Sequence, residues 1–336
     1  MAQSPQSMST YEELLRRKDA PPGSSWHLFG EDDQLGTLNF LTPECVIDAT
    51  RLVRQGTVFN LDYALDAFVP PPVAIRRRVH HHIFQNNPNH RDDWLDSFYL
   101  QSTSQIDGLR HIRHPKYGFY GGVADEQVEV GLPNLGIQLV AERGVVGRGV
   151  LLDVERHLAE TGRPLDPESN YMISISDLEA TAAGVGISIR SGDIVLIRTG
   201  WARHFLGQAE EDRVPSYFAT RHSPGLEQST SMVAWLWDHQ ISLLAADNVA
   251  VEAYPVKPNS GLVDSEECQS GTGTPHDGML HRPLISLLGL FLGELWHLED
   301  LAQACHADGV YEFLLSAKPL NLVGGVGSPA NAMAIK

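Results

Sequence analysis

Hydrogen-bonding side chains are concentrated in one short segment that ends at His111. Asp107 and His111 lie four residues apart, and Gln101 and Gln105 precede them. A carboxylate and an imidazole in such a run either coordinate a cation or move protons, because so many polar groups gain little from packing into a core. The spacing therefore predicts a functional site.

A second group of ligand-type side chains comes much later in the chain. His276, Asp277 and His281 are followed by Glu294, a lone acid with apolar residues on both sides. Burying such a carboxylate is costly unless it is paired or coordinates a cation. We expect the two groups to converge on one composite site.

Ordinary structural roles compete with this interpretation. Asp107 precedes Gly108, and Asp-Gly is a common turn pair. His111 fits a partly buried, hydrogen-bonded histidine, and His281 fits a residue that caps a following helix. At most two of the three consecutive histidines 80–82 can share one face of a strand. The arginines 76–78 fit a solvated turn, although one of them could anchor a substrate carboxylate.

Composition limits the class of protein. The chain has 336 residues, 42% of them hydrophobic, and a net charge of −17. Such an acidic chain is a poor partner for nucleic acid, which requires a basic face. Three scattered cysteines give no disulfide framework, and no apolar run approaches the length of a membrane span. These features predict a cytoplasmic protein without a membrane partner.

Capping signals and apolar runs define the expected elements. Thr42 with Pro43 predicts the start of one helix, and Ser176 with Glu179 predicts the start of another. The runs 149–154 and 193–198 have the pattern of strands that are covered on both faces. Further expected elements are a strand at 58–61, a helix at 232–239 followed by an apolar run at 241–246, and a buried helix at 284–295. This alternation favours an α/β fold, with residues 1–25 as a loosely held N-terminal arm and residues 26–336 as a single domain.

Several strings in this order resemble the cyclase family of metal-dependent hydrolases, which includes bacterial kynurenine formamidase and isatin hydrolase. They are Asp32 to Asn39 with Leu41 to Glu44, the Asp107 and His111 segment, Ser191 to Asp193 through Trp201, Ala246 to Glu252, His281 to Glu294, and Gly324 to Pro329. The resemblance implies a swivelling β/β/α domain with a mixed central sheet flanked by helices. It also implies a homodimer or homotetramer.

The glutamines separate this chain from the formamidase branch. That branch carries His-x-Gly-Thr-His-x-Asp-x-Pro-x-His, in which the first two histidines and the aspartate bind metal and the last histidine is catalytic. The matching positions here are Gln101, Gln105, Asp107 and His111, and the later family ligands match His281 and Glu294. An amide oxygen is a weaker ligand than imidazole and suits harder cations than zinc.

Three arrangements of this divergent site are open. Asp107, His281 and Glu294, with an oxygen of Gln101 or Gln105, would hold a divalent cation such as manganese or zinc. A histidine of the run 80–82 would replace a missing ligand. Alternatively the cation is absent, and Asp107, His111 and Glu294 form a metal-free acid/base set.

The resulting hypothesis is a hydrolase that opens or cleaves a small cyclic or aryl amide, or a lactone. His111 would act as general acid and base, Asp107 and Glu294 would support it, and Gln105 would stabilise the oxyanion. Side chains near the first cluster that could line the substrate pocket are Trp94, Phe119, Tyr120 and His80. The alternatives are a cation-free isomerase, cyclase or lyase, and a non-catalytic ligand-binding relative.

Overall fold

A computed structural model describes residues 8–213, 222–257, 260–263 and 276–336. Its helices are α1 (Tyr11–Leu15), η1 (Gly36–Phe40), α2 (Pro43–Thr50), η2 (Tyr120–Gly122), η3 (Asp125–Gln127), α3 (Gln138–Arg143), α4 (Val154–Glu160), α5 (Ile175–Gly184), α6 (Trp201–Gly207), η4 (Glu210–Asp212), α8 (Thr230–Asp238), the π-helical η5 (Arg282–Leu287) and α10 (Glu299–Asp308). Its strands are β1 (Val58–Asn60), β2 (His80–Asn87), β3 (His90–Asp96), β4 (Gln105–Asp107), β5 (Val145–Asp153), β6 (Met172–Ile173), β7 (Ile194–Arg198), β8 (Gly225–Leu226), β9 (Leu243–Ala246), β10 (Phe291–Glu294), β11 (Glu312–Ala317), β12 (Gly327–Pro329) and β13 (Ala332–Ile335).

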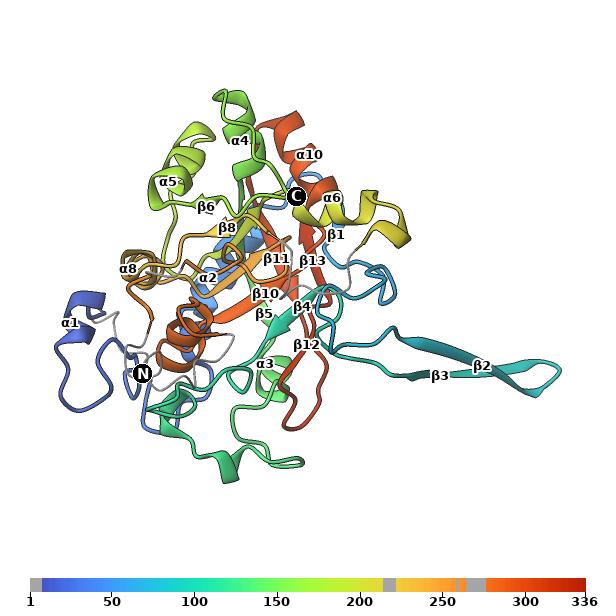
Figure 1. Cartoon of the computed structure of the whole chain (residues 1–336), viewed down its shortest axis with the longest axis horizontal. Helices are drawn as coiled ribbons and strands as arrows, with labels where there is room; N and C mark the ends of the chain where they lie inside the picture. Colours follow the sequence, from blue (N-terminus) through green and yellow to red (C-terminus); the bar gives the residue numbers. More distant parts are fainter. Residues whose placement is uncertain (1–7, 214–221, 258–259, 264–275) are drawn as a thin grey trace.

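One large mixed sheet organises the fold, in the strand order β1-β13-β11-β5-β7-β9-β10-β4-β12. The four strands β5, β7, β9 and β10 run parallel, and the strands on both sides of them join antiparallel. Helix α2 packs against β5 and β11, while α4 and α5 pack against β7 and β5 (Figure 1). The expected α/β class, with a mixed central sheet flanked by helices, is confirmed.

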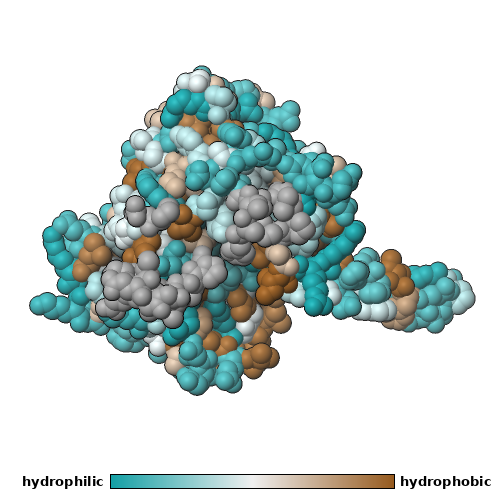
Figure 2. Space-filling view, in the orientation of Figure 1, coloured by the Kyte–Doolittle hydropathy of each residue, from teal (hydrophilic) through white to brown (hydrophobic). Residues whose placement is uncertain are grey.

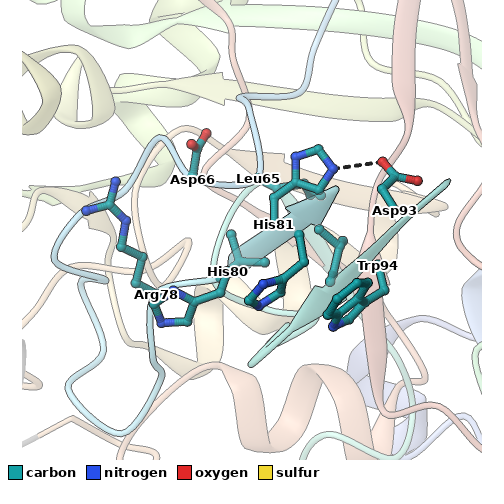
Figure 3. Close-up of a pocket in the computed structure, with 10 residues that line it drawn as sticks. Leu65, Asp66, Arg78, His80, His81, Asp93 and Trp94 are labelled. Atoms are coloured by element: carbon teal, nitrogen blue, oxygen red, sulfur yellow. Dashed lines mark hydrogen bonds and ion pairs between the residues drawn. The ribbon is translucent and has the colours of Figure 1, made fainter. Parts of the chain in front are cut away.

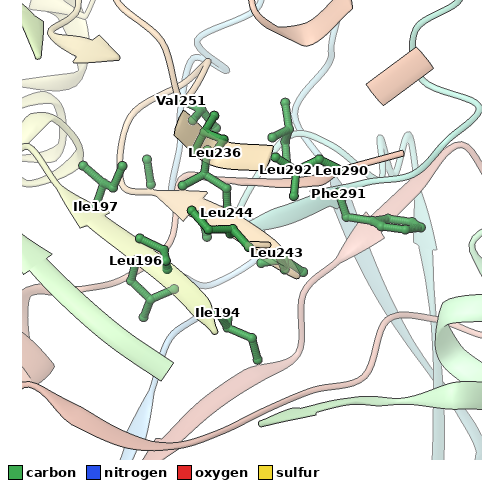
Figure 4. Close-up of a cluster of buried hydrophobic side chains, with 14 of the residues drawn as sticks. Ile194, Leu196, Ile197, Leu236, Leu243, Leu244, Val251, Leu290, Phe291 and Leu292 are labelled. Atoms are coloured by element: carbon green, nitrogen blue, oxygen red, sulfur yellow. The ribbon is translucent and has the colours of Figure 1, made fainter. Parts of the chain in front are cut away.

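The parallel strands carry the centre of the hydrophobic core. Every residue of β7 and β9 is buried, as the continuous apolar runs predicted. Side chains of these strands, of β10 and of α8 meet in one cluster (Figure 4). Burial on this scale is the main favourable contribution to folding, and it holds β10, one of the two neighbouring strands that carry site residues, in the sheet.

No helix within the described ranges combines the length and apolar character needed to cross a bilayer. The N-terminal segment expected to be loose is packed from Tyr11 onward. Tyr11 and Leu14 are buried, α1 packs against α8, and the backbone N–H of Tyr11 donates to Asp238 Oδ1 over 2.7 Å. The boundary between an arm and a domain at residue 25 remains a prediction.

Two expected elements differ from the structure. The predicted buried helix over 284–295 is wrong in its second half, because η5 ends at Leu287 and β10 begins at Phe291. Gly289 has a φ of +67° between them, a left-handed conformation that glycine adopts without strain. The predicted cap at Ser176 is also displaced, since Ser174 caps α5 in a reciprocal pair with Asp177. Asp177 binds Arg163 and Tyr171 as well, which favours the earlier register.

Gly36 marks the closest approach between η1 and the segment that leads into β10. Its φ is +50°, and a Cβ at this position would collide with the backbone carbonyl of Gly289. We predict that Gly36→Ala lowers the free energy of unfolding by about 3 kcal/mol, since left-handed strain and overpacking add. Gly56→Ala is the matched control, with a φ of +72° and open space around the new methyl group. Chemical denaturation of both variants tests this, and equal losses would contradict the collision.

Candidate active site

Gln105 and Asp107 lie on β4, which pairs with β10, the strand that carries Glu294. In the antiparallel register of β4 with β10, Gln105 is directly opposite Glu294, and Asp107 is opposite Leu292. Side chains two residues apart on a strand share a face, so Gln105, Asp107 and Glu294 project to the same side of the sheet. Gln105 Nε2 donates to Glu294 Oε2 over 2.5 Å.

His281 reaches this face from the residue that precedes η5, and a buried carboxylate fixes its ring. The Nδ1–H and the backbone N–H of His281 both donate to Glu252 Oε1, over 2.6 and 3.1 Å. The other oxygen of Glu252 accepts the backbone N–H of Leu280. With Nδ1 engaged, Nε2 of His281 faces the site and lies 3.0 Å from Glu294 Oε1.

Asp107 occupies the centre of the cluster and is fully buried. Its Oδ1 accepts from the amide of Gln101, whereas its Oδ2 is buried without a hydrogen-bond partner among the described residues. That Oδ2 lies 3.6 Å from His111 Nε2 and 3.9 Å from His281 Nε2. A buried carboxylate oxygen without a partner is costly, so this atom is suited to bind a cation.

A divalent cation fits the resulting set of ligand atoms. Asp107, His111 and His281 each offer one ligand atom, and these three atoms lie within 4.8 Å of one another. Two imidazole nitrogens and one carboxylate oxygen form a donor set that zinc and manganese both accept.

This compact set differs from the one expected from the sequence. His111 completes this group in place of Glu294, the ligand that the sequence predicts, and no compact group with Glu294 occurs in the described part of the chain. The amides of Gln101 and Gln105 donate hydrogen bonds to Asp107 and Glu294. Gln101 Nε2 also lies 3.0 Å from His111 Nδ1.

Burial perturbs the titratable groups of the cluster in different directions. It lowers the pKa of His111, and the neighbouring charge of Asp107 partly opposes that shift. Burial alone would also lower the pKa of His281, but hydrogen bonds to Glu252 and Glu294 raise it well above its usual value. The pKa of Glu294 is raised to about 7 by burial and by the charge of Asp107. The pKa of His276 is lowered to about 4, mainly by burial.

A pocket of about 310 Å³ opens onto these groups. Its polar lining residues are Arg76, His111, His276, His281 and Glu294, and its apolar ones are Val73, Ile75, Val249, Ala250 and Met279. A mostly apolar wall with a few convergent polar groups is typical of small-molecule sites.

The predicted substrate-binding aromatics lie elsewhere in this single chain. His80 and Trp94 belong to the β2–β3 hairpin and line a different hollow, at the root of that hairpin (Figure 3). Phe119 and Tyr120 are buried, and the Tyr120 hydroxyl donates to Asp33 Oδ2 over 2.8 Å. None of these four residues lines the pocket at His111.

The two remaining residues of the second group, His276 and Asp277, have different surroundings. His276 lines the pocket, whereas Asp277 accepts a hydrogen bond from Arg282 over 3.3 Å. The glycine-rich loop 271–275 lies outside the described residues.

Sequence reasoning missed Glu252 and gave Arg76 only a passing role. Glu252 follows the apolar residues Val249 to Val251, so it is a lone acid in an apolar setting, as Glu294 is. The same signal would have singled it out. Arg76 Nη1 donates to the carbonyl of Gln101 and lies 3.5 Å from Gln105 Oε1. Within the described residues no carboxylate pairs with Arg76.

Both a family sequence model and a solved structure match this chain over at least half of its length. The sequence model of the family described as "Putative cyclase" matches residues 79–253. A crystal structure described as a novel cyclase is 30% identical with a TM-score of 0.78, and the match covers 93% of this chain and 99% of that one.

More distant structures show the same fold. Isatin hydrolase A from Labrenzia aggregata, bound to benzyl benzoate, is 18% identical with a TM-score of 0.53, covering 85% of this chain and 94% of that one. Isatin hydrolase A from Ralstonia solanacearum is 15% identical with a TM-score of 0.54, covering 83% and 92%. No curated protein matches the chain.

Proposed function

This chain belongs to the cyclase family, and we propose that it is a hydrolase that cleaves the bond between the carbonyl carbon and the nitrogen or oxygen of a small amide, lactam or ester. The observation that carries the proposal is the compact group of Asp107, His111 and His281 beside a partly apolar pocket. The isatin hydrolases that share the fold are named for opening a cyclic amide, which supports this class of substrate.

In the proposed mechanism Asp107, His111 and His281 hold a divalent cation. Such a cation polarises a carbonyl group and lowers the pKa of a bound water. As a ligand His111 is no longer available as the acid/base group, so this role passes to Glu294, which lines the same pocket. Glu294 takes the proton from the attacking water and returns it to the leaving nitrogen or oxygen. The amide of Gln105 orients Glu294 through its hydrogen bond to Oε2.

A hydrolysis screen on the purified protein tests this proposal. The protein is purified without added metal, loaded separately with manganese and with zinc, and assayed on small lactams, aryl amides and aryl esters. We expect turnover that a chelator removes and the same cation restores. A protein that binds neither cation and hydrolyses none of these compounds would refute the proposal.

One observation favours a second candidate, a cation-free isomerase, cyclase or lyase. Both glutamines aim amide hydrogens at carboxylates, at the positions where the formamidase branch has metal-binding histidines. In that case the Asp107–His111 pair moves the protons. Turnover of a small carbonyl compound that persists after complete removal of metal, as verified by elemental analysis, selects this candidate.

Arg76 is expected to make the enzyme prefer substrates that carry a carboxylate group. Its guanidinium lies beside Gln105 at the edge of the pocket, and none of the described carboxylates forms an ion pair with it, although its charge acts on nearby Glu294. We predict that Arg76→Gln raises KM for carboxylate-bearing substrates by about 10- to 100-fold, as expected for one charge-assisted hydrogen bond. KM for neutral substrates of the same shape should stay within about twofold.

Arg77→Gln is the matched control, since Arg77 is an exposed neighbour that does not line the pocket. Steady-state kinetics with paired carboxylate and carboxamide substrates distinguish the two positions. An equal rise in KM for both members of a pair would contradict the anchoring role of Arg76.

A further inference from the structure

His276 lines the pocket at His111 and has no role in the proposed mechanism. The other described polar residues of the pocket each have one: His111 and His281 as cation ligands, Glu294 as the acid/base group and Arg76 as the anchor for a carboxylate. The ring of His276 is not part of the compact ligand group. Its nitrogens have no hydrogen-bond partner within the described ranges. The N–H group of this ring is therefore available to a bound molecule.

A tight turn fixes the position of His276. The backbone N–H of Met279 donates to the carbonyl of His276 over 3.2 Å, and these two residues, which begin and end the turn, both line the pocket. Gly278, at the third position, has a φ of +79°, as a type II turn requires. The carbonyl of Gly278 accepts a hydrogen bond from Ser260 Oγ over 3.1 Å. The turn is thus held by contacts outside itself, and it presents the ring of His276 to the pocket.

The ring of His276 faces that of His111. Their centroids are 6.5 Å apart, and the ring planes are nearly perpendicular, at 87°. An acceptor atom bound beside His111 is within reach of His276, because an N–H···O hydrogen bond spans about 2.9 Å. An imidazole carries an N–H group in both its neutral and its charged form, so this donor is present in either state.

The two glutamines of the cluster do not supply a donor for the oxyanion that forms when water attacks a carbonyl group. Gln105 is the donor that the sequence predicts, but its Nε2 donates to Glu294 Oε2. The Nε2 of Gln101 is directed at Asp107 Oδ1 in the same way. Neither glutamine lines the described part of the pocket. Among its described lining residues, His276 is the N–H donor that is left for this oxygen.

The surroundings of His276 strengthen such a hydrogen bond. Figure 2 shows that hydrophilic residues predominate on the visible face of the main body. The apolar side chains that line the pocket together with His276 are instead all aliphatic: Val73, Ile75, Val249, Ala250 and Met279. A donor held among apolar groups stabilises a developing negative charge more than the same donor does in water.

We propose that His276 is a catalytic residue that donates a hydrogen bond to the carbonyl oxygen of the substrate and stabilises the oxyanion that develops there. This role rests on the proposed hydrolase function. His276 forms no covalent bond and keeps its proton, so the proton transfers remain with Glu294. The hydrogen bond strengthens as negative charge develops on the oxygen, so it accelerates the reaction more than it tightens the binding of the substrate.

Steady-state kinetics of His276→Phe and His276→Gln test this role, with a compound that the wild type hydrolyses in the screen described above. Phenylalanine keeps a flat ring without a donor, whereas glutamine keeps an N–H donor. We expect His276→Phe to lower kcat by about 100-fold and to leave KM within about threefold of the wild-type value. His276→Gln should recover about tenfold of the loss in kcat.

Two binding measurements give readouts besides turnover. Phenylphosphonate is a tetrahedral anion that resembles the intermediate of carbonyl hydrolysis, and the cation-loaded His276→Phe variant should bind it about tenfold more weakly than the wild type does. His276→Gln should lie between the two. Isothermal titration calorimetry with manganese and with zinc should give the wild-type affinity in both variants, because His276 is not part of the ligand group.

His306→Phe is the matched control. His306 is exposed on α10 and does not line the pocket. Its kcat, KM and phenylphosphonate affinity should equal those of the wild type. An unchanged kcat or phenylphosphonate affinity in His276→Phe, or a loss of cation binding in that variant, would overturn the role of His276 alone. A wild type that binds neither cation and hydrolyses none of the screened compounds would refute the proposed function, and this role with it.

Discussion

Asp107→Asn is expected to abolish cation binding without destabilising the protein. The variant replaces an anionic ligand by a neutral amide, and we predict a loss of cation affinity of about 100-fold or more. Turnover should fall by about 10³-fold. Besides losing a ligand for the cation, the site loses the carboxylate that accepts the hydrogen bond of Gln101, the residue next to His111. The free energy of unfolding of the metal-free protein should not decrease, since Asp107 Oδ2 has no hydrogen-bond partner to lose among the described residues.

Asp153→Asn is the matched control, with the opposite expected result. Asp153 is also buried, but it caps α4 and pairs with Arg198 over 2.7 Å and Arg156 over 3.1 Å. Removing its charge should cost about 3 kcal/mol of stability, as for one partner of a buried ion pair, and leave cation affinity unchanged. Isothermal titration calorimetry and chemical denaturation measure the two quantities. Parallel losses in both variants would indicate that Asp107 is structural.

Glu252→Gln is expected to have the second largest effect, although Glu252 does not line the pocket. Its two oxygens accept three hydrogen bonds, from the backbone of Leu280 and from the backbone and ring of His281. A glutamine amide in either orientation places an NH₂ group against one of these donors. The ring of His281 should therefore lose its fixed orientation, and cation affinity should fall by about 10- to 100-fold.

The proton on His281 Nδ1 provides a readout besides activity. In metal-free wild type, its hydrogen bond to Glu252 should give a strongly downfield proton resonance, and Glu252→Gln should shift or remove it. Glu299→Gln makes the same chemical change at a carboxylate that binds Arg198 and Arg203 away from the pocket. An unchanged His281 resonance in Glu252→Gln would contradict the positioning role.

The elements that follow from local patterns were predictable. Thr42 caps α2 with Pro43 at the first helical turn, as the sequence indicates. The apolar runs at 149–154 and 193–198 form the neighbouring parallel strands β5 and β7. The convergence of the Asp107 and His281 segments also holds, because a lone acid such as Glu294 must find partners when it is buried.

Other features depend on tertiary contacts that no local pattern contains. The apolar run after Leu284 has no proline to interrupt it, and it is divided at Gly289, which has a φ of +67° and lies against Gly36 and Tyr120. Trp94 is close to Gln101 in sequence, yet the hairpin carries it away from the site. The placement of Glu294 opposite Gln105 depends on the register of β4 with β10, which sequence spacing does not specify.

The most direct test of the cation site is anomalous diffraction from crystals grown with manganese. We predict one strong anomalous peak at ligand distances of about 2.0–2.2 Å from Asp107, His111 and His281. The same crystals of Asp107→Asn should lack it. A protein that shows no peak at these three residues and hydrolyses its substrate at the full rate after chelation would contradict the account.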